Sequence, residues 1–182
     1  MNYGSMESFL NTVSDLIREK QLPALMIGGH AVTALGHPRA TYDLDLLIPR
    51  TSAQAWGSAL SGLGFKTYAE TSIFIQFEAN ARLPLPPVDL MLVDDDVFES
   101  LASARNNSSP IPTPAVEAMI PLTLHAINQP ARKNTAQDWA DVFALIKANN
   151  LSLDDPGFSA IVSKHGGAVA TERIRSEIPG GN

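Results

Sequence analysis

Two carboxylates, Asp43 and Asp45, interrupt an apolar segment that reads YDLDLLI from residue 42 to residue 48. Burying two acids this close together costs several kcal/mol unless a cation pairs with them. In a β-strand, residues i and i+2 point to the same face and lie roughly 6.6 Å apart. The spacing therefore predicts one strand face that could hold a hard divalent cation such as Mg²⁺. The alternative is a pair of solvated acids on an exposed strand face.

A glycine pair, Gly28-Gly29, follows a short apolar run and precedes a short amphipathic segment. Glycines at such a turn allow the backbone to approach a ligand closely and aim N–H groups at an anion, although they also suit a simple tight turn. A third acid, Asp89, stands in PPVDLMLV, where alternation places Leu90 and Leu92 on the opposite face. An isolated acid among apolar neighbours needs a partner. The three features together favour a site for a metal and an anion.

These residues resemble the nucleotidyltransferase superfamily with the DNA polymerase β-like fold. The resemblance rests on GGHAV from residue 28, on Arg39 and Thr41, on the segment YDLDLLI, and on VDLML from residue 88. It extends to the small bacterial subgroup that includes the AbiEii-type toxins of toxin–antitoxin systems. It covers roughly residues 22 to 145, and its first half is the specific part.

The resemblance implies a nucleotidyltransferase that uses an NTP and two Mg²⁺ ions. Asp43, Asp45 and Asp89 would hold the ions, and Asp89 would help to activate the attacking hydroxyl. The residues expected to contact the nucleotide are Gly28, Gly29, Arg39, Thr41, Lys133 and Asp138. The acceptor is not identified by this resemblance; in a toxin it would be tRNA or a protein, and an antitoxin protein would be a partner. For Arg39, a plain surface charge is the alternative role.

The resemblance is incomplete in the second half of the chain. Relatives commonly carry a lysine in the helix that corresponds to residues 121–126 and a Lys-Asp pair that opens the next helix. Here Thr123 and Gln137 stand near the lysine positions, whereas Asp138 and Asp141 match the family pattern. Losing a lysine removes electrostatic stabilisation of triphosphate charge that amounts to about a few kcal/mol.

Two cations close to these positions, Arg132 and Lys133, are candidates to replace the missing charge. The alternative is that they belong to a solvated loop. The missing lysines also motivate a second hypothesis, in which the chain is a catalytically decayed nucleotide-binding or partner-binding module.

Composition limits the other possibilities. The chain has 182 residues, of which 45% are hydrophobic and 18% are charged, which suits one domain, or one domain with a small helical appendage. The net charge of −6 argues mildly against a large RNA footprint. The absence of cysteine excludes disulfides and thiolate metal sites and fits a reducing compartment. With no signal peptide and no apolar run near 20 residues, we expect a cytoplasmic protein that does not enter a membrane.

Periodicity predicts strands and helices in the first part of the chain and helices in the second. The resemblance implies that they form an α+β fold: a small mixed sheet with flanking helices, followed by a C-terminal helical part. The expected boundary separates an α/β core over residues 1–108 from a helical region over 109–182, which would pack on the core. The expected elements are a helix over 5–20, a strand over 25–27, a helix over 29–35, strands over 42–48, 65–70, 72–78 and 86–93, a helix that Thr51 caps and that Gly62 and Gly64 close, a helix ending at 104, and helices from 113 onward. Residues 152–177 suggest one or two short helices around Gly166 and Gly167.

Overall fold

The computed structural model describes residues 5–80, 84–130, 132–133 and 135–178. The chain divides into two compact units. The first comprises Met1–Ala34 and Arg39–Pro114, and the second comprises Leu35–Pro38 and Ala115–Asn182. The boundary between residues 108 and 109, and the packing of the helical region on the core, stay predictions. Within the described ranges, no helix combines the length and the apolar character that crossing a membrane requires.

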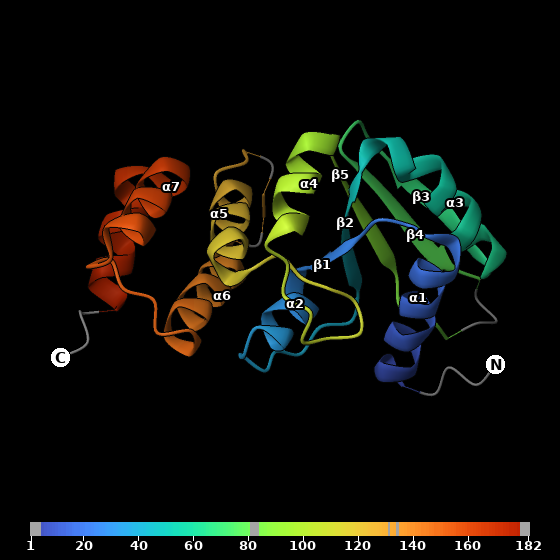
Figure 1. The fold of residues 1–182 in the computed structure, drawn as a ribbon, viewed down its shortest axis with the longest axis horizontal. Coiled ribbons are helices and arrows are strands. Elements are labelled where there is room, and N and C mark those ends of the chain that lie inside the picture. Colours follow the sequence, from blue (N-terminus) through green and yellow to red (C-terminus); the bar gives the residue numbers. More distant parts are fainter. Residues whose placement is uncertain (1–4, 81–83, 131, 134, 179–182) are drawn as a thin grey trace. The chain divides into compact units, whose positions relative to one another are not determined.

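A five-stranded mixed sheet forms the centre of the first unit (Figure 1). The strand order is β1-β2-β5-β4-β3; β2 and β5 run parallel, and the other neighbours are antiparallel. This arrangement confirms the predicted α+β class. The strands are β1 (Leu25–Ile27), β2 (Leu44–Pro49), β3 (Phe65–Glu70), β4 (Phe74–Ala79) and β5 (Val88–Val93).

Helices accompany this sheet at the places that the periodicity predicts. Ser5 caps the first helix, because its hydroxyl accepts a hydrogen bond of 3.2 Å from the backbone N–H of Ser8. The helices of the first unit are α1 (Met6–Lys20), α2 (Gly28–Ala34), the short 3₁₀ helix η1 (Arg50–Ser52), α3 (Ala53–Gly62) and α4 (Asp95–Ser103).

The two faces of the sheet differ in character. One face is mainly apolar: Leu46 and Leu90 are neighbours in register with no exposed surface, and Phe9 of α1 packs on Phe65 with 6.1 Å between the ring centroids. On the other face, Leu25 and Leu47 form a buried apolar cluster with Phe98 of α4. Partly buried apolar residues pack against this cluster: Ile27, Met91, Val93, Leu101 and Ala102. Because α4 covers only part of this second face, polar residues can occupy the remainder.

The second unit is helical, as the sequence predicts, and contains α5 (Val116–Ile127), α6 (Thr135–Ala148) and α7 (Pro156–Glu177). The sequence predicted one or two short helices around Gly166 and Gly167. The structure has the long element α7, in which Gly167 adopts φ 71° and ψ −171° between two helical stretches. The side-chain amide of Asn149, just after α6, donates a hydrogen bond of 3.0 Å to the carbonyl of Leu35. This bond ties the loop after α2 to the second unit.

Candidate active site

One row of residues crosses all five strands on the partly covered face of the sheet. Asp45 of β2 and Asp89 of β5 are register partners on neighbouring parallel strands, and Ile27, Gln76 and Ala69 continue the row through β1, β4 and β3. Each member of the row is partly exposed, whereas the residues on either side of Asp45 and Asp89 are buried. The sheet thus brings two carboxylates from distant segments side by side, at the beginning of two parallel strands.

Asp43 lies at the same place, but outside the strand in which the sequence predicted it. The predicted strand over residues 42–48 is wrong at its start, because β2 begins at Leu44, whose partner Val88 is also the first residue of β5. Asp43 therefore lies in the bend before the strand, and the hydroxyl of Thr41 donates a hydrogen bond of 2.9 Å to its Oδ1. Strand alternation does not orient Asp43; the bend and the contact with Thr41 do.

The two carboxylate oxygens of Asp89 have different surroundings. Oδ2 accepts a hydrogen bond of 2.6 Å from the amide nitrogen of Gln76. Oδ1 is buried and accepts no hydrogen bond from any residue that the structure describes. Burial raises the pKa of Asp89, the Gln76 hydrogen bond lowers it, and the negative charge of Asp43 raises it. A carboxylate with one buried, unsatisfied oxygen and an acidic neighbour is a place where a cation would be strongly stabilising.

The glycine pair allows these side chains to approach one another. Gly28 adopts φ 64°, and a Cβ atom there would lie 2.0 Å from Oδ2 of Asp45. A Cβ atom on Gly29 would lie 2.7 Å from Nη1 of Arg39 and 2.7 Å from Cβ of Thr41. The small size of these glycines makes room for Asp45, Arg39 and Thr41. The four predicted nucleotide contacts of the first unit are thus brought together around the acids.

Replacing Gly28 with alanine is expected to lower the free energy of unfolding by about 1–3 kcal/mol, since the substitution requires both a left-handed backbone and a displaced Asp45. Denaturant unfolding measures this change. Gly57 is the matched control: it lies inside α3 with nothing within 4 Å of an added Cβ. Gly57→Ala should raise stability by about 0.5–1 kcal/mol. Equal effects at the two positions would contradict the close approach of Gly28 to Asp45.

Two further residues lie near the acids. Nε2 of His30 is buried without a hydrogen-bond partner among the described residues. Burial lowers the pKa of His30, the charge of Asp43 raises it, and that of Arg39 lowers it. Tyr68 of β3, which is 52% exposed, has a pKa raised by desolvation and then by the charges of Asp89, Glu78 and Asp43. Sequence reasoning missed Tyr68, because an exposed tyrosine on an edge strand carries no local signal.

The acids do not form a complete metal site by themselves. Within the part of the chain that the structure describes, no three His, Cys, Asp or Glu side chains are arranged to hold a metal ion. Mg²⁺ usually keeps several waters and binds one or two carboxylates together with substrate phosphates. The pair Asp45 and Asp89, with Asp43 beside it, fits this incomplete kind of protein ligand set.

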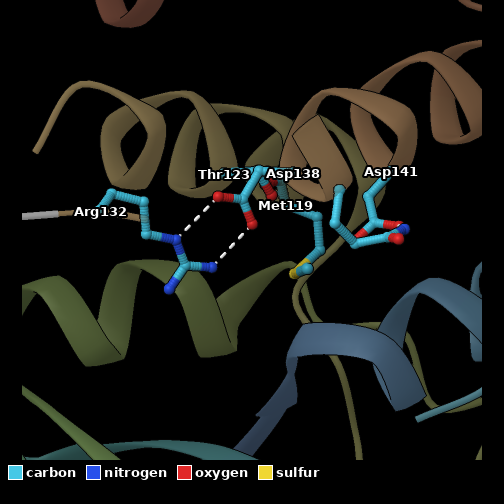
Figure 2. Close-up of polar contacts among 6 residues, drawn as sticks. Met119, Thr123, Arg132, Asp138 and Asp141 are labelled. Atoms are coloured by element: carbon cyan, nitrogen blue, oxygen red, sulfur yellow. Dashed lines mark hydrogen bonds and ion pairs between the residues drawn. The ribbon is translucent and has the colours of Figure 1, made fainter. Parts of the chain in front are cut away.

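The remaining predicted contacts, Lys133 and Asp138, lie in the second unit. Asp138 of α6 is only 7% exposed, and both of its carboxylate oxygens accept hydrogen bonds of 2.7 Å from the guanidinium of Arg132 (Figure 2). The charge of Arg132, a candidate to replace the missing lysines, is therefore matched by Asp138. Lys133 is exposed in the loop before α6.

The positions of the two missing lysines have local hydrogen bonds instead. The amide nitrogen of Gln137 donates a bond of 2.9 Å to Oδ1 of Asp141, which is 6% exposed. The hydroxyl of Thr123 donates a bond of 2.9 Å to the carbonyl of Met119 within α5. Figure 2 shows Asp138 and Asp141 together at this part of the second unit. Both carboxylates are buried and accept hydrogen bonds, Asp138 from Arg132 and Asp141 from Gln137.

The pair Arg132–Asp138 should contribute measurably to stability. Arg132→Ala removes two charge-assisted hydrogen bonds from a buried carboxylate and is expected to lower the free energy of unfolding by about 1–3 kcal/mol. The control is Arg18→Ala, which breaks an ion pair with Asp15 whose side chains are 72% and 56% exposed. That loss should stay below about 1 kcal/mol. If thermal or denaturant unfolding gives the same cost for both variants, Asp138 does not depend on Arg132.

Comparison with known proteins gives a consistent picture at the level of the fold. The chain matches no family model and no curated protein. Among solved structures it is similar to ANT(2'')-Ia in complex with adenylyl-2''-tobramycin, with a TM-score of 0.62, 16% identity, and coverage of 93% of this chain and 97% of that one.

It is also similar to the lincosamide antibiotic adenylyltransferase LnuA, bound to lincomycin, with a TM-score of 0.59, 17% identity, and coverage of 81% and 98%. The Megavirus polyadenylate synthase gives a TM-score of 0.58 at 16% identity and covers 80% of this chain but only 32% of its own. At these identities the similarity concerns the fold. The chain has the fold of nucleotidyltransferases, which the resemblance in its sequence had implied.

Proposed function

We propose that the protein is a Mg²⁺-dependent nucleotidyltransferase that moves a nucleotide from an NTP to a hydroxyl group of an acceptor. The observation that carries the proposal is the pairing of Asp45 with Asp89 across two parallel strands, beside Asp43, with a buried Asp89 oxygen that lacks a donor among the described residues. The fold supports the same reaction class, because its solved neighbours are nucleotidyltransferases.

Asp43, Asp45 and Asp89 are the proposed ligands of the two Mg²⁺ ions. Burial raises the pKa of Asp89, and the negative charge of Asp43 adds to this effect, so a bound cation would relieve both. When bound, Mg²⁺ would neutralise triphosphate charge and lower the pKa of the acceptor hydroxyl. Around it, Thr41 orients Asp43, and Gly28 permits Asp45 to stand close to the turn that begins α2.

In the reaction, the acceptor oxygen forms a bond to the α-phosphorus, and the bond from that phosphorus to the bridging oxygen of the β-phosphate breaks. The products are the nucleotidylated acceptor and pyrophosphate. Asp89 is the proposed general base that takes the hydroxyl proton, because a raised pKa makes a carboxylate a better proton acceptor near neutral pH. The remaining contribution is positioning of the two substrates.

The nucleotide contacts remain those implied by the resemblance. Gly28 and Gly29 would place their backbone against the triphosphate, with Arg39 and Thr41 next to them. Support comes from the close approach of these two side chains to Gly29. Lys133 and Asp138 belong to the same proposal but rest on the resemblance alone.

For the acceptor we propose a small hydroxylated molecule. Two neighbours that are matched over nearly their whole length are ANT(2'')-Ia, seen with adenylyl-2''-tobramycin, and the lincosamide adenylyltransferase. The nucleic-acid enzyme among the neighbours is matched over a third of its length. Transfer to tRNA or to a protein, as in a toxin with a cognate antitoxin, is the competing outcome of the test.

A second candidate function is a nucleotide-binding or partner-binding module without turnover. The observation that favours it is the hydrogen bonding of Thr123 and Gln137 at the lysine positions, together with the neutralisation of Arg132 by Asp138. Calorimetry with each NTP and Mg²⁺ would then give binding, and no product would form with any acceptor.

The test is a screen of the purified protein with the four α-labelled NTPs and Mg²⁺ against three acceptor pools: small hydroxylated compounds including aminoglycosides and lincosamides, total RNA, and cell protein. The proposal expects label in the small-molecule pool. Label in RNA or protein would move the acceptor to the toxin-like alternative, and binding without label in any pool would favour the decayed module.

A further inference from the structure

The alternation of β4 and its register with β5 place Gln76 opposite Asp89. In β4, Ile75 and Phe77 are buried and occupy the apolar face, so alternation turns the side chain between them to the face of the acids. The antiparallel register pairs Gln76 with Asp89 directly. Directly opposite residues on one sheet face have Cβ atoms about 4.5–5.5 Å apart, which is within reach of a glutamine amide.

The contact joins the amide nitrogen of Gln76 to one of the two carboxylate oxygens of Asp89. An ionised carboxylate only accepts hydrogen bonds, so the amide nitrogen of Gln76 faces Asp89 and donates to Oδ2 at 2.6 Å. The bond fixes the orientation of the carboxylate and leaves Oδ1 as the oxygen without a donor in the described chain. Gln76 thereby selects which oxygen of Asp89 is presented to the rest of the site.

The neutral amide also suits this position chemically. A lysine or arginine opposite Asp89 would hold the carboxylate equally well, but it would neutralise the charge that a metal ion needs. An amide donates a hydrogen bond and leaves the negative charge of Asp89 in place. Groups that hydrogen-bond a metal-binding side chain orient it and typically affect metal affinity or activity by about 10–100-fold.

We infer that Gln76 is a positioning residue that orients Asp89 for metal binding and proton transfer, an inference that rests on the proposed function. Gln76 would touch neither the nucleotide nor the acceptor; it would act through Asp89 alone. Its loss should therefore affect the chemical step rather than the binding of the NTP.

The main variant is Gln76→Met, which keeps length and apolar bulk but has no donor. We expect kcat to fall by about 10–100-fold, with KM for the NTP within about twofold of the wild type, and Mn²⁺ affinity measured by calorimetry to fall by a similar factor. Gln76→His, whose Nε2 can donate at a similar reach, should recover most of both losses. Gln54→Met on the exposed face of α3 is the control for the same chemical change and should match the wild type.

Thermal unfolding shows whether Gln76→Met folds. If it does not, Gln76→Leu replaces it, because leucine has no donor and adds no charge beside Asp89. Wild-type kcat and Mn²⁺ affinity in the variant without a donor would overturn the inference, as would losses that histidine does not recover. If the wild-type protein binds Mn²⁺ but transfers no nucleotide, the proposed function is rejected. Weaker Mn²⁺ binding by the variant would then still support the role of Gln76. If the wild-type protein neither binds Mn²⁺ nor transfers a nucleotide, the proposed function and the role of Gln76 are both overturned.

Discussion

Asp45→Asn is expected to lower kcat for nucleotidyl transfer by about 10²–10³-fold while leaving the fold intact. Asparagine keeps the shape of the side chain beside Gly28 but removes the negative charge that faces Asp89 across β2 and β5. An amide oxygen is a much weaker ligand for Mg²⁺ than a carboxylate, so the charge of the triphosphate would no longer be neutralised at this point. The measurement is the initial rate with the NTP and acceptor found in the screen, at saturating Mg²⁺.

The matched control for this substitution is Asp96→Asn, the same chemical change in the exposed first turn of α4. Asp96 lies outside the cross-sheet row, and its loss should change kcat by less than twofold and stability by a few tenths of a kcal/mol, the size of an exposed helix-terminus charge. Comparable losses in both variants would show that net charge, and not the location of Asp45, controls the rate.

Asp89→Asn should have opposite effects on activity and on stability. We expect kcat to fall by about 10³-fold or more, because the substitution removes a metal ligand and the proposed general base together. In the metal-free protein at pH 7–8, the same substitution should raise the free energy of unfolding by up to about 1 kcal/mol, a figure kept small because the group is partly exposed. The cause is the half-buried charge of Asp89 next to Asp43. Denaturant unfolding in the presence of a chelator measures the gain.

The pH dependence of that gain has a definite sign. The folded state raises the pKa of Asp89 above its ordinary value of 3.8, so the folded protein binds the proton more tightly than the unfolded chain. Ionised Asp89 therefore destabilises the fold above the raised pKa, and this penalty disappears as pH falls through that value. The advantage of Asp89→Asn should shrink accordingly in acid. An advantage that grows as pH falls would contradict the raised pKa.

Local patterns predicted most of the secondary structure because each element has a strong local signal. Ser5 and the apolar positions after it mark α1, the glycine at position 64 precedes β3, and alternation marks β4 and β5. The family resemblance implied that Asp45 and Asp89 share one site. The parallel pairing of their strands was not predicted, since no local rule chooses a parallel partner 44 residues away.

The features that the sequence did not reveal depend on contacts between distant residues. The start of β2 is set by its partner β5, so the apolar pattern around Asp43 overstated the strand. The role of Gln76 can be inferred only when its register with Asp89 is known. The need for a small residue at position 28 arises from the approach of Asp45. The ion pair of Arg132 and Asp138 likewise joins a loop residue to a helix residue, and no periodic pattern in the sequence predicts it.

Labelled phosphates show whether Asp45 and Asp89 catalyse attack at the α-phosphorus of an NTP. The wild-type protein is incubated with Mg²⁺, the acceptor and the same NTP labelled at either the α- or the γ-phosphate, and the Asp45→Asn variant is treated in the same way. We expect α-label in the acceptor, γ-label in pyrophosphate, and almost no α-label in the acceptor with Asp45→Asn. Transfer of the γ-label to the acceptor, or equal α-labelling by the two proteins, would rule out this reaction at these residues.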